Sequence, residues 1–254
     1  MSAHIQRTHT KDIDWLLHEK YNGVATDMFY RDIVRIESGE PIDYIIGFTP
    51  FLSCTIDLSY RPMIPRQETE HWVEQLIGDT PKEKPVKCLD IFSGSGCIGI
   101  ALLKHLPRSI VHFGELKKDL VKQIKKNILI NKVEKKRTAI FLGDCFSNIP
   151  ITRYDIITAN PPYIPFDKKT NISRSVLDWE PHEALFAPEH GFYYITRLLK
   201  EGYAYLKKGG SIYIEFDEPQ HNALEELAVK SQQYETSFFK DQFGKWRYVK
   251  LTSI

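Results

Sequence analysis

The chain has 254 residues, and 34 Lys and Arg face 33 Asp and Glu, so its formal net charge is +1. A protein that grips long nucleic acid usually carries a basic excess, so we expect no stable nucleic-acid partner. No apolar run approaches the roughly 18 residues that would suggest a membrane span, and we expect no membrane partner. The 4 cysteines form no Cys-x-x-Cys pair and the 9 histidines show no metal-ligand spacing, which predicts reduced thiols and no metal site.

The first 78 residues are expected to form a smaller N-terminal part of helices and a hairpin. Apolar side chains at helical spacing predict helices within residues 11–40. Residues 42–60, rich in Ile, Phe, Tyr and Thr, predict two short strands around Gly47. A proline-bounded loop then enters a helix that ends at Gly78.

From residue 79 to 254 the pattern changes to strands that alternate with helices, which predicts a second domain. Apolar runs predict strands at 86–92, 109–115, 138–144, 154–160 and 211–217. Helix-like segments lie between them, and the last is the segment 192–210 with a glycine stop. Two final strands, 234–241 and 246–254, follow without a helix between them. This order predicts an α/β fold with a mostly parallel, Rossmann-like sheet and an antiparallel C-terminal strand.

A glycine-rich loop, DIFSGSG, joins the first of these strands to its helix. Gly94 and Gly96 let the backbone come close to a ligand, and open parallel sheets bind ligands beyond the carboxyl ends of their strands. Glu115 ends the next strand, about twenty residues after the loop, where a carboxylate can accept both hydroxyls of a ribose. Asp144 ends a third strand and could meet an adenine amino group. The loop, Glu115 and Asp144 lie at three strand ends, and together they favour a nucleoside-binding row, that is, a nucleoside site across these ends. The alternative is a tight turn with acidic residues nearby by chance.

The fourth strand runs directly into Asn160, Pro161, Pro162 and Tyr163. Two prolines fix two φ angles and remove two backbone donors, so this turn is stiff and extended. The Asn160 side-chain oxygen and the Pro161 carbonyl could accept from one NH2 group, and Tyr163 could pack on a planar group. The alternative is a proline-rich strand exit without a ligand. Its place beside the nucleoside-binding row favours a catalytic turn.

The order of D-I-F-S-G-S-G, E, G-D and N-P-P-Y resembles the class I S-adenosylmethionine-dependent methyltransferases that modify planar amino groups. PIDYIIGFTPF, MIPRQETEHWVE, SVLDWEPHEALFAPEHGFYYITRLL and GKWRYVKL resemble stretches of the HemK/PrmC family of protein-(glutamine-N5) methyltransferases. The resemblance implies S-adenosyl-L-methionine as cofactor. It also implies methylation of the glutamine in the Gly-Gly-Gln motif of a class 1 peptide chain release factor, in support of translation termination.

The site residues then fall into two groups. The catalytic and substrate-binding residues are expected in the turn, where Asn160, Pro161 and Tyr163 act on the amide and Pro162 contacts the substrate. The expected cofactor-binding residues are Phe92, Ser93, Gly94, Ser95, Gly96, Glu115, Asp144, Cys145 and Asn160.

Two positions depart from the family pattern. Phe92 stands where the family usually has glycine, and Cys145 stands where bacterial relatives often carry an aromatic residue, a role that Phe146 is a candidate to fill. With a negative φ, the Phe92 ring packs into the sheet; with a positive φ, the residue is strained by about 1 kcal/mol or more. We expect this departure to affect the affinity for the cofactor and to leave the fold unchanged. These departures favour a eukaryotic, mitochondrial protein; a bacterial one would be cytoplasmic.

Three further features have two interpretations each. Arg66, Glu68 and Glu70 form either a lid over the cofactor or an acidic helix start. The lysine-rich segment 117–136 is a solvated face rather than a patch for an acidic partner or RNA. The long loop around Trp179 shapes a substrate cleft or is simply anchored by that side chain.

Two rival functions remain open. One is a nucleic-acid amino-methyltransferase that uses the same turn, which the near-neutral charge argues against. The other is a non-catalytic protein that lost cofactor binding through Phe92, which the intact turn and Glu115 argue against. We expect a monomer whose N-terminal part recognises the release factor by surface contact, because one glutamine side chain offers too little area for specificity.

Overall fold

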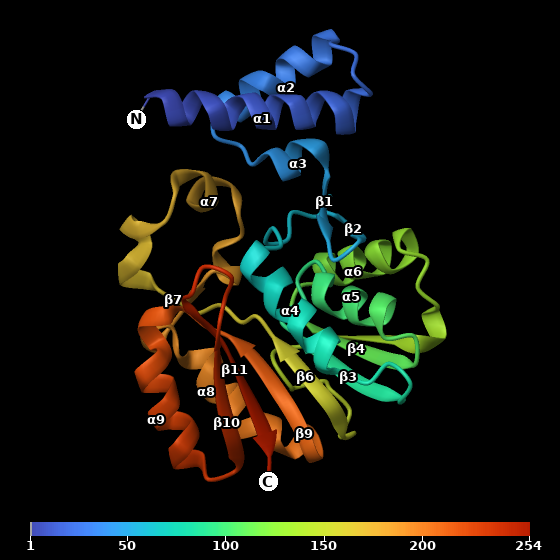
Figure 1. Cartoon of the computed structure of the whole chain (residues 1–254), viewed down its shortest axis with the longest axis vertical. Helices are drawn as coiled ribbons and strands as arrows, with labels where there is room; N and C mark the ends of the chain where they lie inside the picture. The colour runs from blue at the N-terminus through green and yellow to red at the C-terminus, as the bar shows by residue number, and fades with distance from the viewer. Residues whose placement is uncertain (1) are drawn as a thin grey trace.

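A computed structural model describes residues 2–254, with side chains for residues 10–170 and 172–254. Its centre is a seven-stranded sheet of order β10-β11-β9-β6-β3-β4-β5 (Figure 1). The strands are β3 (Val86–Ile91), β4 (Ser109–Glu115), β5 (Thr138–Leu142), β6 (Tyr154–Ala159), β9 (Leu206–Glu215), β10 (Tyr234–Lys240) and β11 (Trp246–Ser253). Strands β5, β4, β3, β6 and β9 are parallel, and β11 runs antiparallel to both β9 and β10. The predicted mostly parallel sheet with its antiparallel C-terminal strand is confirmed.

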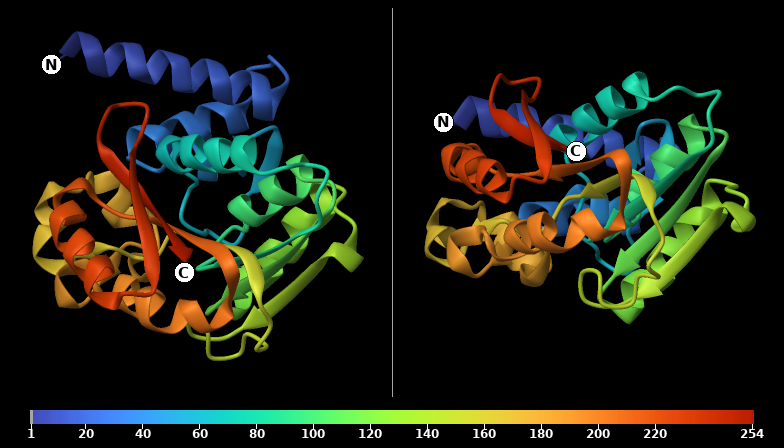
Figure 2. Two further views of the ribbon diagram at one scale, coloured as in Figure 1. Left: turned by 60° about the horizontal axis from the view of Figure 1, so that its bottom comes forward. Right: turned by 90° about the horizontal axis from the view of Figure 1, so that it is seen from below.

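Helices cover both faces of this sheet, and the two helical layers can be followed in Figure 2. Successive strand residues point to opposite faces, so Cys88 belongs to one apolar core and Leu89 to the other. The first core is shared with α4 (Gln67–Asp79), α5 (Cys97–His105) and α6 (Lys118–Ile130). The second is shared with α8 (Tyr193–Glu201) and α9 (His221–Ser231). The carboxyl ends of the parallel strands therefore open between two packed layers.

The N-terminal helices α1 (Ser2–Tyr21), α2 (Asp27–Glu37) and α3 (Ile42–Ile46) lie at one end of the molecule (Figure 1). They have their own apolar cluster, made of Leu16, Phe29, Ile36 and Ile45. The hairpin of β1 (Phe48–Phe51) and β2 (Cys54–Asp57) packs instead into the first core of the sheet domain, through Phe51 and Ile56. The domain boundary at residue 78 stays a prediction. The side chains of the hairpin and of α4 pack into the core of the sheet domain.

Between β6 and α8 the chain makes a long excursion of short elements. It contains β7 (Ile164–Pro165), η2 (Phe166–Asn171), α7 (Arg174–Trp179), η3 (His182–Ala184), β8 (Phe186–Ala187) and η4 (Glu189–Gly191). The other 3-10 turns are η1 (Lys135–Arg137), η5 (Gly202–Tyr205) and η6 (Glu218–Gln220). Across residues 2–254, no helix is long and apolar enough to cross a membrane.

Two local predictions were wrong. Strands were expected on either side of Gly47, but residues 42–46 are helical and Gly47, with φ +99°, ends that helix. The hairpin turn comes later, at Leu52 and Ser53, both with positive φ. Residues 206–210 were expected to end a helix. They begin β9 instead, because Leu206 is buried and pairs with Tyr154, so tertiary pairing overrides helical spacing.

The close packing of α5 on the sheet can be tested at Gly99. A Cβ there would lie 2.3 Å from a Phe113 ring carbon and 3.1 Å from an Asp90 carboxylate oxygen. Gly99→Ala should lower the free energy of unfolding by about 1–3 kcal/mol, measured by urea denaturation. Gly78→Ala in α4 is the matched control, because its Cβ meets nothing within 4 Å and should stabilise by about 0.5–1 kcal/mol. Equal effects of the two substitutions would contradict the packing described.

Candidate active site

A cavity of about 110 Å³ opens at the carboxyl ends of β3, β4 and β6. It brings together most of the residues expected to hold a cofactor, namely Phe92, Ser93, Gly94, Ser95, Glu115, Asp144, Cys145 and Asn160. Gly96 does not line it. This glycine starts α5 with φ +80°, and its Cβ position lies 3.2 Å from Ile124, so it serves helix packing.

The glycine-rich loop turns tightly beneath the cavity. Ser93 donates its N–H to the Gly114 carbonyl at 3.1 Å and its hydroxyl to the Asp90 carbonyl at 2.7 Å. At Gly94, where φ is +56°, an added Cβ would meet only the Phe92 carbonyl, at 4.0 Å, so the space above the loop is open. This is the open backbone surface that a bound nucleoside needs.

Phe92 adopts the strained alternative, with φ +60°. A phenylalanine in this left-handed region costs about 1 kcal/mol or more. Its ring compensates by packing against the second core and by an edge contact with Tyr194, at a centroid distance of 5.1 Å. Tyr194 also lines the cavity, so the two rings form part of its wall. The sequence did not reveal Tyr194, because nothing in its helix marks it as facing the loop.

Glu115 is buried at the base of the cavity and holds the loop in place. One carboxylate oxygen accepts from the Gly94 N–H and the other from the Lys117 N–H, each at 2.8 Å. Burial raises the pKa of this carboxyl, while these backbone donors lower it. Each carboxylate oxygen has a second lone pair. Glu115 can therefore accept two hydroxyl groups of a ligand without releasing the loop.

The next strand end provides a weaker polar contact. Asp144 is half exposed and forms an ion pair with Arg197 of α8 at 2.8 Å. Cys145 lines the cavity with a positive φ of 50°. Phe146, the aromatic candidate beside it, is buried and stacked on Tyr205 and does not line the cavity. The aromatic wall is instead supplied by Phe92 and Tyr194.

Asn160 lies between this cavity and a second one of about 230 Å³. Pro162 lines the first cavity, whereas Pro161 and Tyr163 line the second. The rest of the second cavity is mostly apolar and includes residues of the excursion, such as Ile172 and Val176. The turn thus separates the first cavity from a second one, and Asn160 lines both.

A buried carboxylate behind the turn was not predicted. Glu215 accepts from the Thr69 hydroxyl at 2.7 Å, from the Trp72 indole N–H at 2.8 Å and from the Tyr163 hydroxyl at 3.2 Å. Thr69 in turn accepts from the Asn160 amide nitrogen at 3.2 Å. Burial raises the pKa of Glu215, and burial together with this carboxylate raises that of Tyr163. The only feature of the sequence that could have indicated Glu215 as a site residue is its position at the end of a strand, on the sheet edge that also carries Glu115.

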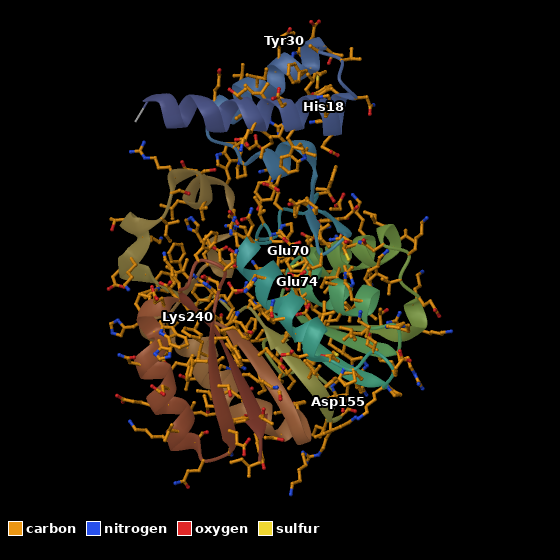
Figure 3. All side chains as sticks on the ribbon, in the orientation of Figure 1. His18, Tyr30, Glu70, Glu74, Asp155 and Lys240 are labelled. Atoms are coloured by element: carbon orange, nitrogen blue, oxygen red, sulfur yellow. The ribbon has the colours of Figure 1, made fainter. Side chains whose placement is uncertain are left out.

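The segment before α4 anchors the excursion, and its Met63 and Pro65 also line the first cavity. Arg66 forms an ion pair with Glu180, which also accepts from the Ile64 N–H at 3.1 Å. Glu70, which is labelled on α4 in Figure 3, accepts from the Leu52 N–H at 2.6 Å and so ties α4 to the hairpin. Within the described side chains, no group of His, Cys, Asp or Glu could hold a metal ion.

Some lysines of the segment 117–136 form ion pairs with acidic neighbours. Lys126 pairs with Asp57 at 2.7 Å, and Lys122 pairs with Asp119 at 2.8 Å. Lys117, which precedes α6, pairs with Glu183 of the excursion at 2.8 Å, and both line the first cavity. A patch for an acidic partner therefore gains no support from these contacts.

The sheet order and the site at its carboxyl edge define a class I methyltransferase fold. A family model described as "Methyltransferase small domain" matches residues 71–178. Among solved structures, a methyltransferase from Pyrococcus furiosus is 16% identical, with a TM-score of 0.59, and covers 88% of this chain and 98% of its own. M. jannaschii TYW2 in complex with AdoMet is also 16% identical, with a TM-score of 0.52, and covers 82% of this chain and 86% of its own.

Closer relatives specify the family. A release factor glutamine methyltransferase from Bacteroides thetaiotaomicron is 34% identical over 85% of this chain and 77% of its own length. One from Streptococcus pneumoniae is 33% identical over 94% of this chain and 84% of its own. The chain belongs to the release factor glutamine methyltransferase (HemK/PrmC) family, as its motifs predicted.

The anchor formed by Glu180 can be tested by proteolysis. Glu180→Ala removes the acceptor for Arg66 and Ile64, so the excursion should open locally more often. We expect tryptic cleavage at the exposed Lys169 and Arg174 to accelerate about fivefold or more, the effect of about 1 kcal/mol. Asp178→Ala, at an exposed neighbour, should leave the rate unchanged. Equal cleavage of both variants and the parent protein would show that Glu180 does not anchor this segment.

Proposed function

We propose that this protein transfers a methyl group from S-adenosyl-L-methionine to the side-chain amide nitrogen (N5) of the glutamine in the Gly-Gly-Gln motif of a class 1 peptide chain release factor. Membership of the family supports this function, since the curated relatives bear that name. The observation that carries it is the position of Asn160 between two cavities, with its amide nitrogen bound to Thr69. The turn can therefore face a methyl donor on one side and an amide on the other.

The first cavity fits the cofactor. The open backbone at Gly94 and the free lone pairs of Glu115 suit a nucleoside with two ribose hydroxyls. Asp144 uses one oxygen for Arg197, which leaves the other for an adenine amino group. Phe92, Ser93, Ser95 and Cys145 complete the lining. When bound, S-adenosyl-L-methionine supplies a methyl group activated by a positively charged sulfur.

The turn must make an amide react. An amide nitrogen is a poor nucleophile, because its lone pair is delocalised into the carbonyl. The side-chain oxygen of Asn160 and the carbonyl of Pro161 accept from the two N–H groups of the substrate, which fixes its plane. These acceptors also stabilise the positive charge that develops on the nitrogen during transfer. After methyl transfer the positively charged nitrogen loses a proton, which leaves a neutral N-methyl amide. Tyr163 packs beside the planar group, and Pro162 stiffens the turn.

The remaining features of the proposal concern partners and location. Residues 1–78 recognise the release factor by surface contact, and the protein acts as a monomer without stable nucleic acid. The two release factor glutamine methyltransferases described above come from bacteria, and they give no support to the mitochondrial location that was expected. We propose the cytoplasm, which was the expectation for a bacterial protein.

Mass spectrometry tests the function directly. A release factor incubated with this protein and S-adenosyl-L-methionine should gain one methyl group on the Gly-Gly-Gln glutamine, and a release factor with Glu at that position should gain none. No gain despite calorimetric cofactor binding would favour a nucleic-acid substrate. No gain without cofactor binding would mean that the protein kept the fold and lost the reaction.

Asn160→Ala tests the role of the turn. The variant loses an acceptor that stabilises the transition state, so transfer should fall by about 100-fold or more. Cofactor binding should remain within a few-fold, because the loop and Glu115 are untouched. Single-turnover rates and calorimetry measure the two effects, with the exposed Asn222→Ala as control. Full activity of Asn160→Ala would contradict the mechanism.

Phe92→Gly tests the unusual loop residue. Relief of positive-φ strain, about 1 kcal/mol, should offset the lost packing of the ring, so stability should change little. Loss of an apolar wall of the cavity should weaken cofactor binding by about threefold or more. Phe92→Ala, which loses the ring but keeps the strain, should be the less stable of the two. An unchanged dissociation constant in both variants would show that Phe92 does not affect the cofactor.

A further inference from the structure

The two prolines of the turn fix its backbone but not the side-chain amide of Asn160. The last torsion of an asparagine side chain is broad and roughly two-fold, so the amide can present either its oxygen or its NH2 group. An NH2 group turned toward the NH2 group of the substrate would set donor against donor. A rigid turn is therefore not sufficient for the reaction, and another group must select one orientation of the amide.

A chain of buried hydrogen bonds supplies that selection. The Thr69 hydroxyl has one hydrogen, and the Glu215 carboxylate 2.7 Å away can only accept it. The oxygen of Thr69 is then left as an acceptor for Asn160, 3.2 Å away. The amide nitrogen must lie on this side, because an amide oxygen there would face an oxygen without a hydrogen to give. The amide oxygen of Asn160 is the part left for a ligand in the cavities.

We propose that Thr69 and Glu215 are positioning residues, which hold the amide of Asn160 so that its oxygen accepts from the substrate's NH2 group. This inference rests on the proposed function. Neither residue needs to touch the reacting atoms, since both act through Asn160.

The surroundings of Glu215 make this selection firm. Glu215 is 1% exposed and Thr69 is 2% exposed, so little water can reach the hydrogen bond between them, although Thr69 also lines the first cavity. Trp72 donates to the same oxygen of Glu215 as Thr69 does, and an indole N–H can only donate, which keeps that oxygen an acceptor. Tyr163 donates to the other oxygen, so the carboxylate also ties the far end of the turn. The three donors come from α4 and the turn, and the acceptor ends β9.

Thr69→Val is the sharpest test, because it removes the hydroxyl and keeps the shape. Without the Thr69 hydroxyl, the amide loses the hydrogen bond that stabilises its productive orientation. The rate constant of transfer at saturating substrates should therefore fall by about tenfold, the effect of one hydrogen bond. The cofactor dissociation constant, measured by calorimetry, should stay within about twofold. Thr69→Ser, which retains the hydroxyl, should restore most of the rate. A rate equal to that of the parent protein in Thr69→Val would overturn the proposal.

A double-mutant cycle separates positioning from a structural role. In the Asn160→Ala background there is no amide to orient, so Thr69→Val should cause no further loss. The same tenfold loss in both backgrounds would overturn the proposal, because Thr69 would then act without Asn160.

A measurement without substrate distinguishes this inference from the proposed function. NMR relaxation of the Asn160 side-chain NH2 group should show an ordered amide in the parent protein and in Thr69→Ser. In Thr69→Val it should show clearly larger motion. An amide equally ordered in all three would overturn the positioning role, even if release factor methylation is found. Absence of methylation with the expected NMR result would overturn the substrate and leave the positioning role intact.

Discussion

The carboxylate of Glu215 is sealed from water, so its oxygens must find their donors inside the protein. They find them on α4, through Thr69 and Trp72, and on the Asn160–Tyr163 turn, through Tyr163. A buried carboxylate without its donors costs several kcal/mol. This requirement fixes how α4, the end of β9 and the turn meet. The position of the Asn160–Tyr163 turn, and with it the geometry of the second cavity, depends on these contacts.

The two buried carboxylates at the sheet edge divide the work of the site. Glu115 is held by two backbone N–H groups and keeps lone pairs for a ligand. Glu215 is occupied by three side-chain donors and serves the architecture. Burial raises the pKa of both, yet their different donors give them different roles. Two glutamates on the same edge of the sheet, at the ends of β4 and β9, thus have different roles: one can bind a ligand and the other holds protein side chains in place.

The sequence predicted the parts of the site that follow from local rules. Glu115, Asp144 and Asn160 end parallel strands, and such ends converge at one edge. It could not decide the φ of Phe92, because both signs were compatible with the chain before packing was known. Tyr194 and the Thr69–Glu215 bond were missed because they join segments whose approach depends on the whole sheet. The hairpin was misplaced because Gly47 ends a helix where it was expected to separate strands.

The sequence distances spanned by the site have a consequence for folding. Thr69 and Glu215 are 146 positions apart, and Ile64 and Glu180 are 116 apart. Contacts between such distant segments form only after the intervening chain has lost its entropy, so they tend to appear late and slowly. A partly folded chain with an intact glycine-rich loop would still lack an oriented turn. Recovery of catalysis during refolding would then follow completion of the sheet, later than the return of helical signal.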